Sequence, residues 1–83
     1  MKKEIFTIAE LTTLGFQELQ GDKLDEGGYY TWYGFYKNES EIHITYEYGQ
    51  EGAFDLGYVE FNGEVLTGRE ITKSDVEFLM ELM

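Results

Sequence analysis

The chain has 83 residues, 17 Asp and Glu against 6 Lys and Arg, no cysteine and a formal net charge of −11. This length predicts a single domain over residues 1–83, and the lack of cysteine excludes disulfides and thiolate metal sites. The scarcity of Lys and Arg disfavours direct contact with nucleic acid or an anionic membrane, and the lack of any long apolar stretch predicts a cytoplasmic protein.

Residues 7–15 carry the start and stop signals of a helix. Thr7 and Glu10 have the spacing of a capping box, in which each side chain accepts a hydrogen bond from the backbone N–H of the other residue. Gly15 is the expected left-handed residue that ends the helix. A second interpretation continues the helix to Gln20, because apolar residues at helical spacing extend that far. We favour the early stop, with residues 16–20 as a short strand.

Residues 21–28, GDKLDEGG, contain three glycines and four charges, which predicts a loop. The acids of this loop do not fit a calcium-binding loop of the EF-hand type. Counted from Asp22, position three is Leu24 and position twelve is Tyr33, where such a loop needs oxygen ligands. We therefore predict no metal site and no cofactor.

Residues 29–48 predict a β-hairpin with an unusual number of rings. Six aromatic side chains fill eight consecutive positions from 29 to 36, whereas a strand buried on one face needs them at alternate positions only. Residues 41–48, EIHITYEY, alternate cleanly between apolar and polar side chains. This alternation is typical of an antiparallel strand with one wet face.

Two registers of this hairpin place different rings on the polar face. With a two-residue loop, Phe35 lies opposite Ile42, and Trp32 and Tyr36 lie on the polar face. With a three-residue loop, Tyr36 lies opposite Ile42 and Phe35 moves to the polar face, because a slip by one residue exchanges the faces. In both registers at least two rings share a sheet face with glutamates.

The remaining chain predicts further strands and a second helix. Residues 54–61 form a strand in which Gly57 is the expected bulge. Asn62–Gly63 is a hairpin-turn signal before a short return strand at residues 65–66. Thr72 is the expected N-cap of the last helix. The predicted fold class is α+β, with a four- to five-stranded antiparallel sheet flanked by an N-terminal and a C-terminal helix.

The polar sheet face with its surplus rings has three possible uses. The C-terminal helix could cross to this side and bury the rings in a second small core. The rings could instead form an interface with a partner protein or a second copy, since Tyr and Trp are favoured interface anchors. A third use is a platform on which a small ligand stacks, although no polar groups converge there in a recognisable pattern.

The sequence predicts no enzyme and no catalytic residues. His43 is the one histidine, and neither a cysteine nor a recognisable nucleophile motif accompanies it. Close pairs of carboxylates, such as those of glycosidases, carry little meaning in a chain with 17 acids, because such pairs arise by chance.

The function expected from these features is that of a small acidic binding or inhibitor protein that docks on a basic surface of a partner protein. A sharper version is a nucleic-acid mimic that blocks a nucleic-acid-binding protein or a defence nuclease. Carboxylates at i and i+2 of a strand lie roughly 6.4–6.8 Å apart, comparable in scale to the phosphates of one DNA strand. The alternative is a homodimeric structural or assembly module that buries the aromatic face. The predicted partner-binding residues are Trp32, Tyr36, Glu39, Glu41, Glu47, Glu51, Asp55, Tyr58 and Glu60.

Overall fold

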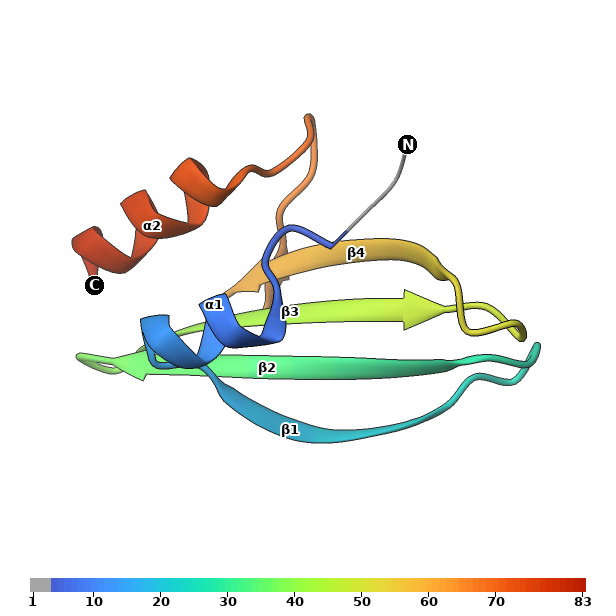
Figure 1. The fold of residues 1–83 in the computed structure, drawn as a ribbon. Helices are drawn as coiled ribbons and strands as arrows, with labels where there is room; N and C mark the ends of the chain where they lie inside the picture. Colours follow the sequence, from blue (N-terminus) through green and yellow to red (C-terminus); the bar gives the residue numbers. More distant parts are fainter. Residues whose placement is uncertain (1–3) are drawn as a thin grey trace.

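A computed structural model describes residues 4–83 as a five-stranded antiparallel sheet with one helix at each end of the chain (Figure 1). In chain order the elements are α1 (Ile8–Leu14), β1 (Gln17–Lys23), β2 (Tyr29–Lys37), β3 (Ser40–Tyr48), β4 (Phe54–Phe61), β5 (Glu64–Val65) and α2 (Lys73–Leu82). The strands lie side by side in the order of the chain. The predicted α+β fold is therefore confirmed. Within residues 4–83, neither helix has the length and apolarity that a membrane crossing requires.

Helix α1 begins and ends where its local signals predict. The Thr7 and Glu10 side chains each accept a hydrogen bond from the other residue's N–H, which completes the capping box. Gly15 has a φ of 100°, and the Phe16 N–H donates to the Leu11 carbonyl at 2.9 Å. This left-handed cap turns the chain out of the helix and into β1, so the early stop is confirmed.

Strand β1 continues through Gly21 to Lys23, so the loop predicted over residues 21–28 was wrong in its first three residues. The register between β1 and β2 shifts between Leu19 and Asp22. At this bulge a Cβ on Gly21 would overlap the backbone carbonyl of Tyr30. Glycine therefore lets the strand bend and resume pairing, and the connection to β2 is confined to residues 24–28.

The β2–β3 hairpin has the register of the two-residue loop. Asn38 and Glu39 both have a positive φ, 51° and 68°, as a type I′ turn requires. Phe35 lies opposite Ile42 and Tyr36 opposite Glu41. The three-residue alternative was wrong, and the even-numbered residues of β2 lie on the polar side of the sheet.

The second hairpin joins β4 to β5 at Asn62 and Gly63, which also have a positive φ, so this predicted turn is confirmed. The bulge predicted at Gly57 lies instead at Asp55, where the pairing with β3 skips one residue. Gly57 is in regular register opposite Tyr46, and a Cβ there would lie 3.0 Å from a carbon of the Tyr46 ring. Close packing against this ring explains the glycine.

The core lies between one face of the sheet and both helices. Its buried side chains are Phe6, Leu11, Phe16, Tyr33, Ile42, Ile44, Tyr46, Val59 and Val76. Leu11 belongs to α1 and Val76 to α2, so both helices contribute to the same core. The Lys73 ammonium also lies 2.7 Å from the Glu10 carboxylate, which joins the N-terminal ends of the two helices. A helix on each face, with a second core around the surplus rings, is therefore not observed among residues 4–83.

The N-terminal segment is tied to this core by Tyr46. The Tyr46 hydroxyl accepts from the Phe6 N–H at 3.0 Å and donates to the Phe6 carbonyl at 3.1 Å. Burial raises the pKa of this phenol to about 12.

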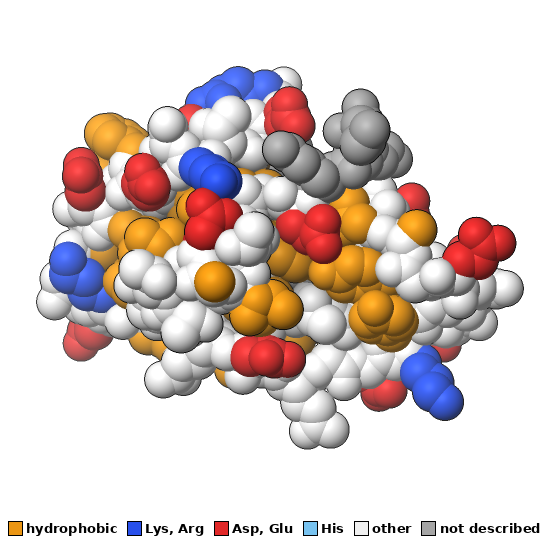
Figure 2. Space-filling model, viewed as in Figure 1, with side chains coloured by type: hydrophobic (Ala, Val, Ile, Leu, Met, Phe, Trp, Pro, Cys, Tyr) orange, Lys and Arg blue, Asp and Glu red, His pale blue; other side chains and the backbone are white. Residues whose placement is uncertain are grey.

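Figure 2 shows that hydrophobic side chains remain visible beside α1 on this helix-bearing face, with carboxylates dispersed around them.

Candidate functional site

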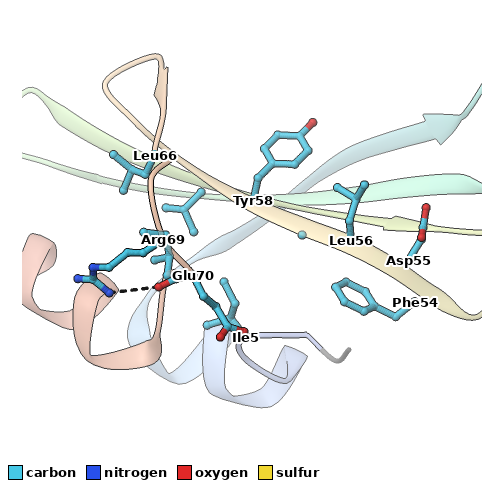
Figure 3. A pocket seen from close by; sticks show the side chains of 11 residues that line it. Ile5, Phe54, Asp55, Leu56, Tyr58, Leu66, Arg69 and Glu70 are labelled. Atoms are coloured by element: carbon cyan, nitrogen blue, oxygen red, sulfur yellow. Dashed lines mark hydrogen bonds between the residues drawn. The ribbon is translucent and has the colours of Figure 1, made fainter. Parts of the chain in front are cut away.

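The sheet face opposite the helices carries the aromatic rings and acids that do not belong to the core. We call it the open face. Its central side chains, from the pairing registers, are Tyr30, Trp32, Tyr36, Glu41, His43, Thr45, Glu47, Leu56, Tyr58 and Glu60. Figure 3 looks at the sheet from the β4 edge: Tyr58 and Leu56 point away from the helices, whereas Phe54 and Ile5 lie on the helical side. Within residues 4–83, neither helix covers this face.

Three rings of the open face hold one another in place. The His43 ring lies 5.2 Å from the Trp32 ring and 5.7 Å from the Tyr36 ring, between centroids. The Tyr36 hydroxyl and His43 Nε2 share a hydrogen bond of 3.1 Å, and Trp32 Nε1 donates to the Gln20 carbonyl at 2.7 Å. Gly34 lies opposite His43 and has no side chain, so the Tyr36 side chain lies over its backbone. These contacts define one arrangement of the three rings in the free chain.

A hollow of about 310 Å³ lies beside these rings; we call it the open-face hollow. Its lining side chains are Leu24, Tyr30, Trp32, Thr45, Glu47, Tyr58 and Glu60. Thr45 is only 6% exposed and is the buried polar residue beneath this hollow. In the described part of the chain, the ion pairs join Arg69 to Asp75 and Lys73 to Glu10. No described Lys or Arg therefore pairs with Glu47 or Glu60.

Six of the nine predicted partner-binding residues come together on the open face. They are Trp32, Tyr36, Glu41, Glu47, Tyr58 and Glu60. Glu39 lies instead in the β2–β3 turn, Glu51 in the β3–β4 loop and Asp55 in the β4 bulge.

The carboxylates of the open face do not follow one another at the i, i+2 spacing that was compared with the phosphates of a DNA strand. Glu39 has left-handed backbone geometry in the turn and does not continue the strand that contains Glu41. His43 and Thr45 stand between Glu41 and Glu47, which are therefore about 20 Å apart along β3. The acids of the open face lie on two neighbouring strands, β3 and β4.

Sequence reasoning left Tyr30, Thr45 and Leu24 out of the predicted binding set. Tyr30 and Thr45 follow directly from the alternation of β2 and β3 once the two-residue turn fixes the register. Leu24 follows β1 in the chain, and no periodic pattern in the sequence places it beside Trp32.

A second and larger hollow, of about 590 Å³, lies at the outer edge of β4 (Figure 3). We call it the β4-edge hollow. It is lined by Ile5, Phe54, Asp55, Leu56, Gly57, Tyr58, Val59, Leu66, Arg69, Glu70 and Ile71. Arg69 donates to both oxygens of Asp75, at 2.7 and 2.8 Å, and this guanidinium holds the pKa of Asp75 well below its usual range. Sequence reasoning did not identify this hollow, which depends on how the segment after β5 leaves the sheet.

Comparison with protein-family models, curated proteins and solved structures gives no significant match for this chain.

Proposed function

We propose that this chain is a small, non-enzymatic acidic protein that docks through its open face on a basic surface of a partner protein. One observation carries the proposal: aromatic rings and carboxylates lie side by side on a sheet face that neither helix covers. The central side chains of this face include no Lys or Arg. Tyr and Trp are favoured anchors of protein interfaces, and surrounding carboxylates select a partner of opposite charge.

The open-face hollow favours an arginine side chain of that partner. A guanidinium is planar, so it stacks on rings such as Trp32 and Tyr58, and its fork of donors matches a carboxylate such as Glu47 or Glu60. A lysine ammonium offers the charge without the planar fork. The chemistry of the hollow therefore favours Arg over Lys at the centre of the interface.

Mimicry of nucleic acid is the narrower version of this function. The net charge of −11 supports it, because a surface that binds phosphates also attracts a dense set of carboxylates. The distribution of Glu41, Glu47 and Glu60 over two strands gives no regular phosphate-like spacing. We therefore propose a basic partner in general, with nucleic-acid competition as a separate question for experiment.

Self-association through the open face is the alternative. It would bring two sets of carboxylates into one interface, between chains that each carry a net charge of −11. Like-charge repulsion opposes such a dimer, and the burial of unpaired carboxylates adds to the cost. The charge therefore favours a different, basic partner.

The experiment compares two variants that lose the same number of charges. The open-face variant carries Glu41→Gln, Glu47→Gln and Glu60→Gln; the control carries Glu64→Gln, Glu77→Gln and Glu81→Gln, all at exposed positions away from this face. Immobilised chains are used to capture proteins from a lysate of the native host, and a captured protein is purified and measured in a binary binding assay. We expect the wild type and the control to bind it alike and the open-face variant to lose about tenfold or more in affinity.

Salt and duplex DNA complete the test. Binding should weaken about tenfold or more between roughly 0.05 and 0.5 M salt, because exposed charges are screened. Equal binding by the open-face variant, or binding that is independent of salt, would contradict the proposed function. Added duplex that displaces the chain supports mimicry, whereas simultaneous binding of duplex and chain excludes mimicry and leaves the basic-partner proposal standing.

A further inference from the structure

Among the described residues, no strand pairs with the outer edge of β4 over most of its length. The short strand β5 pairs with β4 only at Glu60 and Phe61, after which the Leu66 N–H donates to the Val59 carbonyl at 2.9 Å. The chain then leaves the sheet toward α2 (Figure 1). Within residues 4–83, residues 54–58 therefore have β3 on one side and no strand on the other.

The backbone of this edge presents hydrogen-bonding groups in the geometry of a strand. Val59 directs its carbonyl outward to Leu66, and outward-facing residues alternate along an antiparallel strand. Gly57 therefore directs its N–H and carbonyl outward as well, while Tyr58 pairs inward with Thr45. Gly57 has no side chain that would obstruct an approaching chain.

The β4-edge hollow lies directly beside these groups. Phe54, Ile5 and Ile71 form apolar walls of this hollow, with Ile5 and Phe54 on the helical side (Figure 3). Leu56 is 39% exposed on the open-face side of the same edge. Because side chains of a strand alternate between the two faces, an added strand would direct every second side chain toward the hollow.

The opposite edge of the sheet, formed by β1, has features that hinder the addition of another strand. β1 has a bulge at Gly21 and exposed charges at Glu18, Asp22 and Lys23. Bulges and charged side chains are the usual means by which proteins block edge pairing. The β4 edge combines unpaired backbone with a hollow that has apolar walls, so it is the better site for an added strand.

Charge selects the occupant of this site. Asp55 and Glu70 line the hollow, and the charge of Arg69 is already compensated by Asp75. A second copy of this chain would bring another net charge of −11 to the same edge. An extended basic segment of another protein has the complementary charge.

We propose that the β4 edge binds an extended basic segment of a partner protein as a sixth strand, with apolar side chains in the β4-edge hollow and Lys or Arg on the opposite face of that strand, attracted by the negative charge around this edge. The bonds of such a strand come from its backbone, as in other cases of strand addition. This site shares Tyr58 with the open-face hollow, but it uses the backbone edge of β4 and does not depend on the function proposed for the open face.

The experiment uses a capped hexapeptide of alternating valine and lysine and the full ¹⁵N-labelled chain. We expect saturable NMR shifts at Gly57 and Val59 and slower hydrogen exchange of the Gly57 N–H. Two isomers of the peptide, methylated either on the valine nitrogens or on the lysine nitrogens, carry the same charge. In an extended peptide, the N–H groups of the valines lie along one edge and those of the lysines along the other. Only one of these edges faces β4, so one isomer should retain its affinity and the other should lose about tenfold or more in affinity.

Leu56→Lys and Val65→Lys provide matched variants. Both place a lysine at an exposed apolar position of the open-face side, one beside the unpaired stretch and the other on β5. Leu56→Lys should weaken binding of the hexapeptide several-fold by charge repulsion, and Val65→Lys should leave it within about twofold. Equal effects of the two variants would contradict the proposed site.

Three further outcomes would overturn the proposal. The first is no saturable binding of the hexapeptide at millimolar concentration, and the second is equal affinity of the two methylated isomers. The third is protection of the Gly57 N–H by the chain alone at high concentration, which would assign the edge to a second copy. The open-face variant separates the two proposals: it should keep the difference between the isomers even if its loss of carboxylates abolishes docking of the open face.

Discussion

Both faces of the central strands carry several aromatic rings but differ in what surrounds them. On the helix-bearing face of β3, Ile42, Ile44 and Tyr46 are fully buried. On the open face of the same strand, Glu41, His43 and Glu47 keep partial contact with solvent. Aromatic content therefore does not distinguish core from surface in this chain; the placement of the two short helices does.

The tyrosines Tyr46 and Tyr36 make the difference concrete. Tyr46 is 1% exposed, and its hydroxyl exchanges two hydrogen bonds with the backbone of Phe6. Tyr36 is 51% exposed, and its hydroxyl shares a hydrogen bond with His43. A buried phenol needs a partner inside the protein, whereas an exposed ring remains available for one outside it.

The largest effect is expected from the core side of the sheet. Ile44→Ala removes fully buried methyl groups from the centre of β3, which typically costs about 2–5 kcal/mol of unfolding free energy. Tyr36→Ser on the open face should cost less than about 1 kcal/mol, because the ring is half exposed. Urea denaturation of both variants measures the contrast. If Tyr36→Ser costs as much as Ile44→Ala, the open face is a second core and docking through it is excluded.

Tyr46→Phe sharpens the comparison with a smaller change. It leaves the ring in place but removes the hydroxyl that bonds to both the N–H and the carbonyl of Phe6. Buried groups left without a hydrogen bond should lower the free energy of unfolding by about 1–3 kcal/mol. The matched variant is Tyr36→Phe, which removes an exposed hydrogen bond to His43 and should cost less than about 0.5 kcal/mol. Denaturation midpoints that fall equally for both variants would contradict the assigned role of the Phe6 contact.

Alkaline pH should affect the same contact. Burial raises the pKa of Tyr46 to about 12, against about 10 for an unfolded tyrosine. Because the folded-state pKa is the higher one, this stabilisation is complete below pH 10 and is lost as the pH rises toward 12. Burial, with the nearby Glu4 carboxylate, also raises the pKa of Tyr48 to about 12, so some dependence should remain in Tyr46→Phe. Denaturation midpoints across this range should fall less steeply for Tyr46→Phe than for the wild type.

The fold could be predicted wherever its determinants are local. The capping box at Thr7, the N-cap at Thr72 and the left-handed Gly15 depend on residues within one helical turn, and each is observed. The continuation of β1 through Gly21 and the bulge at Asp55 depend on contacts across strands, so composition alone misplaced them.

The candidate site was predictable in its residue types and less so in its geometry. Alternation in β2 and β3 places rings and acids on one face, but only the turn decides which rings. Glu39 has a positive φ, which is uncommon for a residue with a long side chain, so the sequence left the two registers open. The β4-edge hollow had no signal in the sequence, because it arises where β5 stops early.

Two glycines on opposite faces give the finest test of the comparison. At Gly57 a Cβ would lie 3.0 Å from a carbon of the buried Tyr46 ring, which has no room to move, so Gly57→Ala should cost about 1–2 kcal/mol. At Gly34 a Cβ would lie 2.7 Å from the Tyr36 hydroxyl, the far end of an exposed side chain that is able to swing away. The reduced freedom of the unfolded chain then offsets the lost Tyr36–His43 bond, so Gly34→Ala should be within about 0.5 kcal/mol of the wild type. If Gly34→Ala proves as costly as Gly57→Ala, the rings of the open face are packed as rigidly as the core, and a partner would meet a surface that is unable to adjust.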